Sequence, residues 1–407
     1  MENRPFFPSR GRPLDPVNIA FIVLTPIVAI VGTSWYVYRY GVTWLEVANF
    51  LLMFILTGMA VTGGYHRYFA HRTYECNRAL QLFYLVFGAA AVENSLLSWA
   101  SDHRLHHRYV DTDDDPYNIL RGGLYAHMGW IFYKDTRNPA TKFENVPDLL
   151  KNPLVVWQHR WYLPLVIVMT FALPTYIGLI QGRPVGGLLW GGFLRVVVVH
   201  HMTFFVNSIA HLYGSRPYSE ENTARDNWWV GPLTFGEGYH NFHHAFPADH
   251  RNGIRWYQFD VTKWWLRACE FGGFAWNLRR MPESAILLAR LRVQMAHLER
   301  RWAAAGAPPT LWERVEARVH RGRERVEEAM TRYYLARAEY RRQKAQWSRD
   351  LRRDFRVKLA QYQTEFDEAM AGWRQTLRAM HRYPRPSAQG LLTLTALLDV
   401  FRMRGGL

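Results

Sequence analysis

Long apolar runs alternate with polar segments in the first half of the chain, at about residues 17–38, 42–64, 162–180 and 186–210. Each run is about as long as an α-helix needs to cross the ~30 Å hydrocarbon core of a membrane. A short turn at Tyr40 and Gly41 joins the first two runs, and the Gly- and Pro-containing turn 181–185 joins the last two. The pattern therefore predicts an all-α integral membrane protein whose four transmembrane helices form two hairpins.

A fifth apolar run, residues 79–92, spans only 14 residues before Glu93 and Asn94 interrupt it. That length is more typical of a buried or interfacial helix than of a crossing one. With four crossings, both termini lie on the same side of the membrane. The N-terminal tail, residues 1–16, carries three arginines, and segments rich in Lys and Arg beside a span tend to stay in the cytoplasm. We therefore expect both termini to be cytoplasmic.

After Pro282 the chain becomes rich in Ala, Arg, Glu, Leu and Gln, which are good helix formers. Residues 283–407 hold 25 Lys and Arg against 14 Asp and Glu. Apolar residues recur there at spacings of four and seven, as in an amphipathic helix or a coiled coil: Leu311, Val315, Val319, Val326 and Met330. The sequence predicts a membrane domain at 17–282, a basic helical, coiled-coil-like extension at 283–383 and a tail at 384–407.

Charge and cysteine content narrow the classes of partner and cofactor. The formal net charge of +16 fits nucleic acid, anionic lipid or an acidic protein. Beside membrane spans, anionic lipid headgroups are the simplest partner, and we expect no nucleic acid. The two cysteines, Cys76 and Cys269, lie far apart and outside any CxxC spacing. They therefore exclude an iron–sulfur centre within the chain and give no disulfide framework.

Histidine is concentrated in one part of the chain, because 14 of the 17 histidines fall between residues 66 and 250. Three short motifs stand beside the apolar runs: HRYFAH with His66 and His71, HRLHH with His103, His106 and His107, and HNFHH with His240, His243 and His244. His211 follows at the end of the last run. Three such motifs indicate a metal centre. For five other histidines we expect an ordinary buried, hydrogen-bonded role: His127, His159, His200, His201 and His250.

The spacing of the motifs suggests how they bind metal. On an α-helix, residues at i, i+3 and i+4 share a face while neighbours diverge by about 100°. Each HxxHH motif can therefore serve two ions at once. His66 and His71 are five residues apart and would not point together on a straight α-helix, so we expect them to serve different ions or to lie where the helix unwinds.

The number of histidines indicates more than one metal ion. Imidazole suits iron, zinc, copper and nickel, so the ligand type does not identify the metal. Eight or nine histidines are too many for one tetrahedral zinc and suit a pair of higher-coordinate ions with open positions. A shared centre also requires His66 to meet His103 on one side of the membrane. A crossing helix at 79–92 would separate them by ~30 Å, so that segment should not cross.

The motifs resemble the histidine boxes of the membrane-bound stearoyl-CoA and acyl-lipid delta-9 desaturases, here of bacterial type. The resemblance covers about residues 40–265 and rests on HRYFAHRTYE, WASDHRLHHRYVDTDDDPYN, NSIAH and GEGYHNFHHAFPADHRNGIRWYQFDVTKW. It implies four transmembrane helices beneath a cytosolic helical cap that holds two irons. By position, the nine ligands would be His66, His71, His103, His106, His107, His211, His240, His243 and His244, with Asn207 reaching one iron through water. Asp102, Asp226 and Glu237 are candidates to orient imidazoles.

The chain departs from the animal acyl-CoA members of that family at positions that hold the CoA headgroup. Those proteins place a basic residue before the Asp of the second box and a basic pair after the HxGW element. Here Ser101 precedes Asp102, and Lys134 is followed by Asp135. A phospholipid-bound or carrier-bound chain therefore stays open beside acyl-CoA as the substrate.

The resemblance implies an O2-dependent fatty acyl desaturase that introduces a cis double bond, at the delta-9 position, into a saturated chain. Attack on an unactivated methylene pair needs an oxidant that side chains cannot supply and that a reduced metal pair with O2 can. The chain contains no HPGG-type haem motif, so we expect a separate electron donor of ferredoxin or cytochrome type with its reductase. The expected location is a bacterial inner membrane with a cytoplasmic active site. We also expect self-association through the C-terminal helices.

Two other functions fit parts of the pattern. A di-iron membrane hydroxylase or alkane monooxygenase begins with the same hydrogen abstraction, but its family spaces the boxes differently. A histidine-rich metal transporter should carry its ligands near mid-span. The motifs here lie on polar flanks rich in Arg and Asp, so the pattern favours the desaturase.

Overall fold

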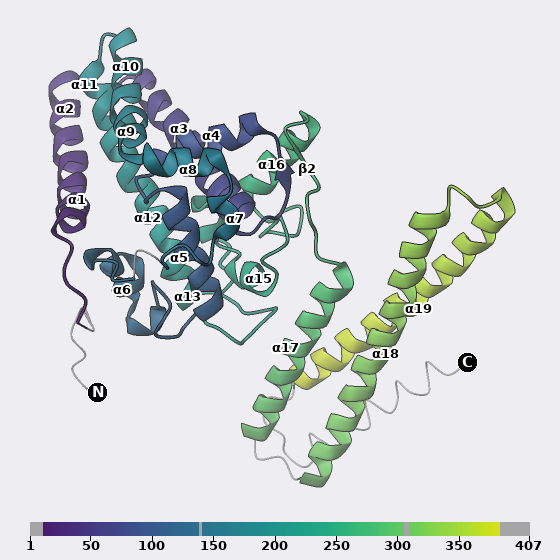
Figure 1. Ribbon diagram of the computed structural model, residues 1–407. Coiled ribbons are helices and arrows are strands. Elements are labelled where there is room, and N and C mark those ends of the chain that lie inside the picture. Colours follow the sequence, from purple (N-terminus) through teal and green to yellow (C-terminus); the bar gives the residue numbers. More distant parts are fainter. Residues whose placement is uncertain (1–10, 138–140, 305–308, 383–407) are drawn as a thin grey trace. The chain divides into compact units, whose positions relative to one another are not determined.

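The computed structural model of the chain describes residues 11–137, 141–304 and 309–382 (Figure 1). The predicted tail at 384–407 and most of the tail at 1–16 lie outside the described residues. The chain divides into two compact units, Met1–Met281 and Pro282–Leu407. Regular structure in both is almost wholly helical, which confirms the expected all-α class.

Four helical segments of the first unit are long and apolar enough to cross a membrane: Pro16–Tyr40, Trp44–Ala70, Tyr162–Ile180 and Pro184–Leu212. The first segment consists of α1 (Pro16–Ile27), η1 (Val28–Gly32) and α2 (Thr33–Tyr40), and the second of α3 (Trp44–Met59) and η2 (Ala60–Ala70). The third consists of α9 (Tyr162–Val166), η5 (Ile167–Ala172) and α10 (Leu173–Ile180). The fourth consists of α11 (Pro184–Gly187), η6 (Leu188–Leu194), α12 (Arg195–Asn207) and α13 (Ile209–Leu212). The prediction of four transmembrane helices is confirmed.

The surface of these segments carries large apolar side chains that water would not favour. Ile30, Val31, Leu163 and Ile180 are each more than 60% exposed. Exposed apolar surface of this extent is expected where lipid surrounds a helix. The chain is therefore an integral membrane protein.

One end of the two hairpins is held together by a buried acid. Glu46 accepts hydrogen bonds from the Tyr36 hydroxyl and from Nε of Arg183, both at 2.7 Å. The second carboxylate oxygen of Glu46 accepts a hydrogen bond from the backbone N–H of Thr43. Thr43 is the N-cap of α3, and the two residues form a capping box. Because Arg183 lies in the turn between the last two spans, this cluster fixes one hairpin against the other.

A cap of short elements follows the second span and the fourth span. It contains β1 (Glu75–Cys76), α4 (Arg78–Ala89), α5 (Leu96–Tyr109), η3 (Ile119–Arg121), α6 (Gly123–His127), η4 (Gly129–Phe132), α7 (Pro147–Leu150), α8 (Pro153–Arg160), α14 (Val230–Leu233), α15 (His240–Ala245), α16 (Val261–Phe271) and β2 (Ala275–Trp276). The two strands pair antiparallel, with Glu75 opposite Trp276. The apolar run at 79–92 forms α4, which is shorter than the four candidate spans.

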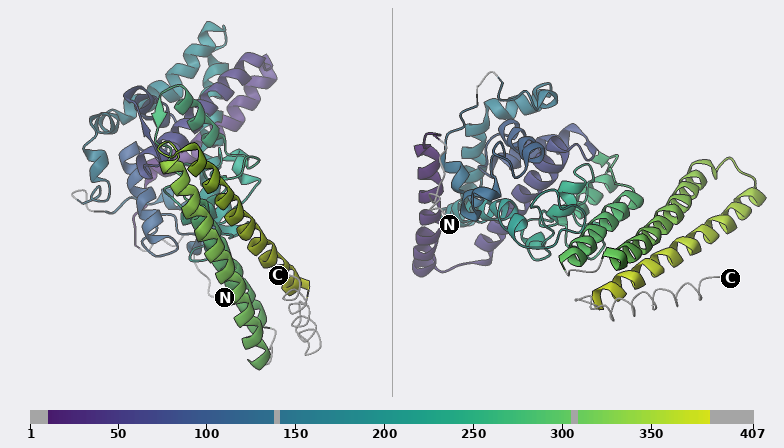
Figure 2. Two further views of the ribbon diagram at one scale, coloured as in Figure 1. Left: turned by 90° about the vertical axis from the view of Figure 1, so that its right-hand side faces the viewer. Right: turned by 90° about the horizontal axis from the view of Figure 1, so that it is seen from below.

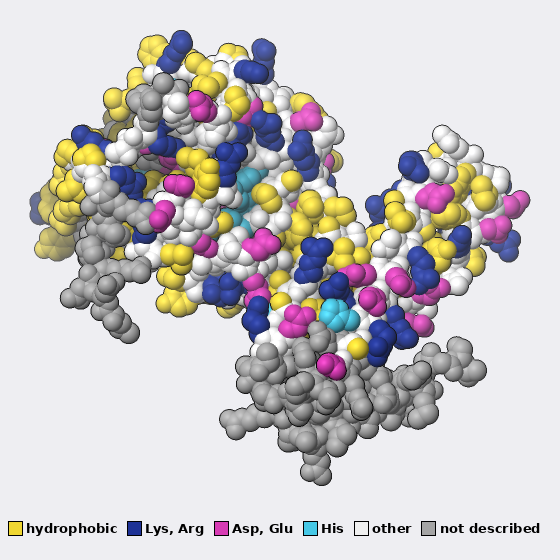
Figure 3. Space-filling model, turned by 60° about the horizontal axis from the view of Figure 1, so that its bottom comes forward, with side chains coloured by type: hydrophobic (Ala, Val, Ile, Leu, Met, Phe, Trp, Pro, Cys, Tyr) yellow, Lys and Arg dark blue, Asp and Glu magenta, His cyan; other side chains and the backbone are white. Residues whose placement is uncertain are grey.

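The second unit contains α17 (Glu283–Ala304), α18 (Pro309–Gln343) and α19 (Arg349–Arg382). The long helices α18 and α19 run side by side (Figure 2). The unit has a core of its own, which includes Leu291, Leu298, Val326 and Trp373. Of the predicted apolar positions, Val319, Val326 and Met330 are buried, and the side chains of Leu311 and Val315 lie outside the described residues. Basic and acidic side chains are interleaved on the face of this unit seen in Figure 3.

Candidate metal centre

The first histidine pair lies at the end of a π-helix. In η2 the hydrogen bonds run from i+5 to i, and the N–H of His71 donates to the carbonyl of His66 at 3.1 Å. This wider helix brings residues five apart onto the same face. His66 and His71 therefore point together, with ring centroids 4.9 Å apart. Of the two alternatives expected for this pair, service to different ions does not agree with the grouping, whereas a local departure from the straight α-helix is present as this more loosely wound π-helix.

The other two motifs lie on short helices of the cap. His103, His106 and His107 belong to α5, and His240, His243 and His244 belong to α15. In each motif the adjacent histidines point in different directions, as the helical repeat predicts. His211 lies in α13, which continues the fourth span. All of these elements belong to the first unit.

The histidines gather into two groups. Within each group, all of the donor atoms lie within 4.8 Å of one another. The first group contains His66, His71, His103, His107 and His243, and the second contains His106, His211, His240 and His244. These are the nine histidines that the resemblance singled out, and both HxxHH motifs contribute to both groups. In contrast, His127, His159, His200, His201 and His250 lie outside the two groups.

The spacing of the ring nitrogens can be compared with metal geometry. In the first group the Nε2 atoms of three pairs lie 2.7–3.0 Å apart: His71 and His103, His107 and His243, and His66 and His243. In the second group two pairs lie 3.0–3.1 Å apart: His240 and His244, and His211 and His240. Ligands ~2.1 Å from a metal are ~3.0 Å apart at right angles and ~3.4 Å apart in a tetrahedron. The spacing fits coordination numbers above four.

Partners at Nδ1 determine which ring nitrogen faces the centre. Nδ1 of His66 lies 2.9 Å from Glu237, and Nδ1 of His106 lies 2.9 Å from Asp115. An Nδ1–H that donates to a carboxylate leaves Nε2 as a lone-pair acceptor. The buried Nε2 of His106 has no hydrogen-bond partner in the described part of the chain. Lone pairs that converge in this way repel one another unless a cation lies between them, so these residues fit a metal centre.

Burial also favours the form of histidine that binds metal. The pKa values of His103, His107 and His243 lie well below the usual histidine value. The main cause is burial away from water, and the positive charge that neighbouring histidines would carry adds to it. The pKa of His240 and His244 is lowered for the same reasons. These imidazoles are therefore neutral at neutral pH, and neutral imidazole is the ligand form.

Only one of the three acids expected to orient an imidazole does so. Glu237 contacts His66, and Arg67 holds the same carboxylate by a 3.0 Å ion pair. Asp102 instead pairs with Arg137. Asp226 accepts a hydrogen bond from the N–H of Phe242 at 3.0 Å and so supports the backbone of α15.

Sequence reasoning missed two further partners of the histidines. Asp115 lies in the quoted second box, nine residues after His106, where its acidic type was the available signal. Thr223 lies 2.7 Å from Nδ1 of His211 and donates its hydroxyl to Asp111 at 2.7 Å. No pattern in the sequence distinguished Thr223.

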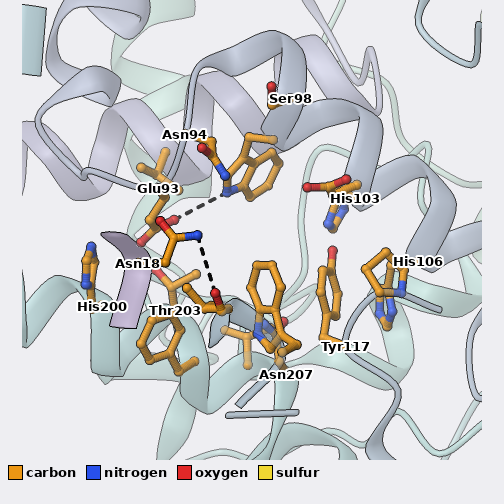
Figure 4. Close-up of a pocket in the computed structure, with 18 of the residues that line it drawn as sticks. Asn18, Glu93, Asn94, Ser98, His103, His106, Tyr117, His200, Thr203 and Asn207 are labelled. Carbon is orange, nitrogen blue, oxygen red and sulfur yellow. Dashed lines mark hydrogen bonds between the residues drawn. The ribbon is translucent and has the colours of Figure 1, made fainter. Parts of the chain in front are cut away.

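A cavity of about 850 Å³ reaches both histidine groups. It is lined by His66 and His103 of the first group and by His106 and His240 of the second. Figure 4 shows His103 and His106 along one side of the cavity, with Asn207 at the end of α12 nearby. Asn207 therefore lies in the cavity wall, outside the two histidine groups.

The lining of the cavity combines charged and apolar side chains. The charged ones include the exposed Asp113 and Asp114 and the half-buried Arg121. Apolar residues that include Phe54 and Phe235 line it elsewhere, with ring centroids 5.1 Å apart. Charged residues, apolar residues and histidines of both groups therefore share one cavity.

Comparisons with known proteins agree with this geometry. Residues 43–280 match the family described as fatty acid desaturase. The chain is 42% identical over 255 residues to a probable acyl-CoA desaturase of Schizosaccharomyces pombe, covering 62% of this chain and 53% of the relative. It is 38% identical over 303 residues to acyl-CoA desaturase 1 of Saccharomyces cerevisiae (73% and 58%), and 36% identical over 248 residues to stearoyl-CoA desaturase 2 of Mus musculus (59% and 68%).

The matched region covers more than half of the chain and includes all nine histidines of the two groups. The chain spans a little over half the length of the two fungal relatives. The chain belongs to the fatty acid desaturase family.

Proposed function

We propose that this protein is an O2-dependent fatty acyl desaturase that introduces a cis double bond, at the delta-9 position, into a saturated acyl chain. The observation that carries the proposal is the placement of two groups of histidines beside a large, partly apolar cavity, whose wall includes histidines of both groups. Several relatives are named as acyl-CoA or delta-9 desaturases, which supports the reaction and the bond position.

In this proposal each histidine group would hold one iron, and Asn207 would contribute through a water molecule. When bound, the iron pair would use O2 and two electrons to supply the oxidant that removes two hydrogens from the methylene pair, with water as the other product. Glu237 and Asp115 keep the Nε2 atoms of His66 and His106 directed at the centre. The cavity would hold the acyl chain beside the histidines.

The charged part of the cavity lining, which includes Arg137, would take the headgroup of the substrate. Arg137 lies beside Ser101, and its Nη1 donates to the Ser101 hydroxyl at 3.3 Å. Arg137 therefore places a basic side chain beside Ser101, the position at which the animal acyl-CoA enzymes carry a basic residue. Asp102 and Asp135 both form ion pairs with Arg137. The names of the relatives favour acyl-CoA, and a phospholipid acyl chain is the competing carrier.

We further propose that the site faces the cytoplasm, that the host membrane is a bacterial inner membrane, and that a separate ferredoxin- or cytochrome-type donor with its reductase supplies electrons. The arginines of the N-terminal tail support the orientation. Cysteines introduced at exposed Arg72 and Arg108 test it, because Cys76 and Cys269 are both buried. Both introduced thiols should react with a membrane-impermeant reagent only from the cytoplasmic side, and labelling from opposite sides would contradict a shared centre.

Product analysis tests the proposed reaction. The chain is expressed in a host that lacks delta-9 desaturation, and its lipids are analysed by gas chromatography with mass spectrometry. Monounsaturated fatty acids with a delta-9 bond are expected. Hydroxylated fatty acids would identify the hydroxylase alternative, and altered cell metal content without new lipid would identify the transporter. Purified protein supplied with saturated acyl-CoA or with saturated phospholipid then distinguishes the two carriers.

A further inference from the structure

An arginine is buried within the fourth membrane span, away from the histidine centre. Arg195 is the first residue of α12 and is fully buried. Among the described residues no acid forms an ion pair with it, and its Nη2 has no hydrogen-bond partner. A charged side chain within a span is costly and usually serves a function. The contacts of Arg195 therefore need an explanation.

Arg195 contacts the end of the helix that does not cross the membrane. Helix α4 ends at Ala89, and the amides of residues 90–92 bond back to the carbonyls of residues 87–89. The carbonyls of Ala90 and Ala91 are left without partners in the helix. Nη1 of Arg195 donates to the Ala90 carbonyl, and Nε2 of His200 lies 2.8 Å from the Ala91 carbonyl. The fourth span thus caps α4 with a cation and an imidazole.

The chain after this cap has an unusual backbone. Val92 and Asn94 have φ values of 59° and 76°. Positive φ is uncommon outside glycine, and for a β-branched residue such as valine it costs of order 1 kcal/mol or more. Thr170 adds a further hydrogen bond to the Ala90 carbonyl at 3.3 Å. Contacts from the third and fourth spans therefore hold a strained turn, which we define as residues 90–94.

The 90–94 turn forms part of the cavity wall. Val92, Glu93 and Asn94 line the cavity, and Figure 4 shows Glu93 and Asn94 opposite Asn207. Glu93 accepts a hydrogen bond from Nε1 of Trp99 at 3.3 Å. The Trp99 ring in turn stacks on His103, with centroids 4.9 Å apart and planes 18° apart. A displacement of the turn would move the wall beside a histidine of the first group.

We propose that Arg195 is a positioning residue for the acyl chain. Through the Ala90 carbonyl it holds the 90–94 turn, and the turn sets how far the chain advances past the histidines and therefore which methylene pair lies beside them. This inference rests on the proposed desaturase function. A role in folding alone would lower the amount of intact protein without changing the position of the double bond.

The test compares Arg195→Met and Arg195→Lys with a matched control, Arg183→Met. The control leaves Glu46 buried without its cation and so destabilises the protein at a site that does not line the cavity. Each protein is expressed in the host lacking delta-9 desaturation. Double-bond positions are then read from dimethyl disulfide adducts by mass spectrometry, with iron per chain measured on the purified protein.

In Arg195→Met, the share of products with a displaced double bond should rise roughly tenfold, the scale expected for one lost hydrogen bond from a charged donor. Arg195→Lys should keep most of the wild-type distribution of double-bond positions. Arg183→Met should lower the yield of protein without changing that distribution. Hydrogen exchange at the amides of the 90–94 turn should accelerate in Arg195→Met only. An unchanged distribution in Arg195→Met, with iron retained, would overturn the inference.

Two further variants cover the possibility that Arg195→Met does not accumulate. Thr170→Val and His200→Gln each weaken one hydrogen bond to the same pair of carbonyls. At least one should displace the double bond, and an unchanged distribution in both would overturn the inference. Wild-type protein that forms no unsaturated product would instead contradict the proposed function, and the inference with it.

Discussion

The carbonyl of His66 accepts the amide hydrogen of His71 across five residues, at 3.1 Å. This π-helical bond brings two imidazoles of the same motif into one histidine group. The π-helix η2 occupies the last eleven residues of the second span. The geometry of the site therefore depends on a wide helix within the membrane domain.

Gly64→Ala tests the packing that accompanies this helix. A Cβ atom at Gly64 would lie 2.4 Å from Cγ of Tyr84, so the tyrosine of α4 would have to move. Overpacking of this kind costs about 1–3 kcal/mol, and we expect a lower melting temperature and less bound iron. Gly63→Ala is the matched control, because its Cβ would lie 3.3 Å from the Tyr84 hydroxyl. Equal melting temperatures for wild type and Gly64→Ala would show that the close packing of Gly64 against Tyr84 does not contribute to the stability of the protein.

The predictable part of the site consisted of local patterns. The HxxHH spacing predicted that the adjacent pair His106 and His107 would diverge and could serve different ions, because α-helical geometry follows from sequence separation. For His66 and His71 the same reasoning left two alternatives open, since nothing in HRYFAH indicates whether the helix is an α-helix or a π-helix. Contacts between residues that lie far apart in the sequence could not be predicted either. Arg195 meets Ala90 across 105 residues, and this contact depends on how the helices pack.

Asp115→Asn tests the support of the second histidine group. Asn cannot accept the His106 Nδ1–H with a full negative charge, so the imidazole is less well oriented. Loss of such a partner typically lowers metal affinity about 10- to 100-fold. Chelator competition on the purified variant measures the change. Asp113→Asn changes an exposed acid of the same loop and should leave iron affinity as in the wild type.

Glu93 should make stability depend on pH. Burial raises the pKa of Glu93 to about 7, so folding favours the protonated acid over the carboxylate. Its stabilising contribution is complete below the unfolded value of 4.5 and is lost as the pH rises through about 7. Relative to wild type, Glu93→Gln should gain ~3 kcal/mol between pH 4.5 and pH 8. Melting curves in detergent over this range measure the difference, and a constant offset would contradict the assignment.

Truncation after Pro282 tests the separation of the two units. The second unit has its own core, and all nine histidines of the centre lie in the first. We expect the truncated protein to retain iron and some activity with an artificial reductant, but to associate less with itself, the donor or anionic lipid. Size-exclusion chromatography with light scattering and vesicle binding follow the loss. Loss of iron on truncation would show that the C-terminal helices help to build the site.

The iron content of the purified protein shows whether the two histidine groups bind a pair of iron ions. Inductively coupled plasma mass spectrometry of purified wild-type protein should give about two irons per chain, because two histidine groups of five and four donors suit a pair of higher-coordinate ions. His243→Ala removes a donor of the first group and His106→Ala a donor of the second, and each should lower the iron content and abolish desaturation while membrane insertion is retained. One zinc per chain, or full activity in either variant, would contradict the account.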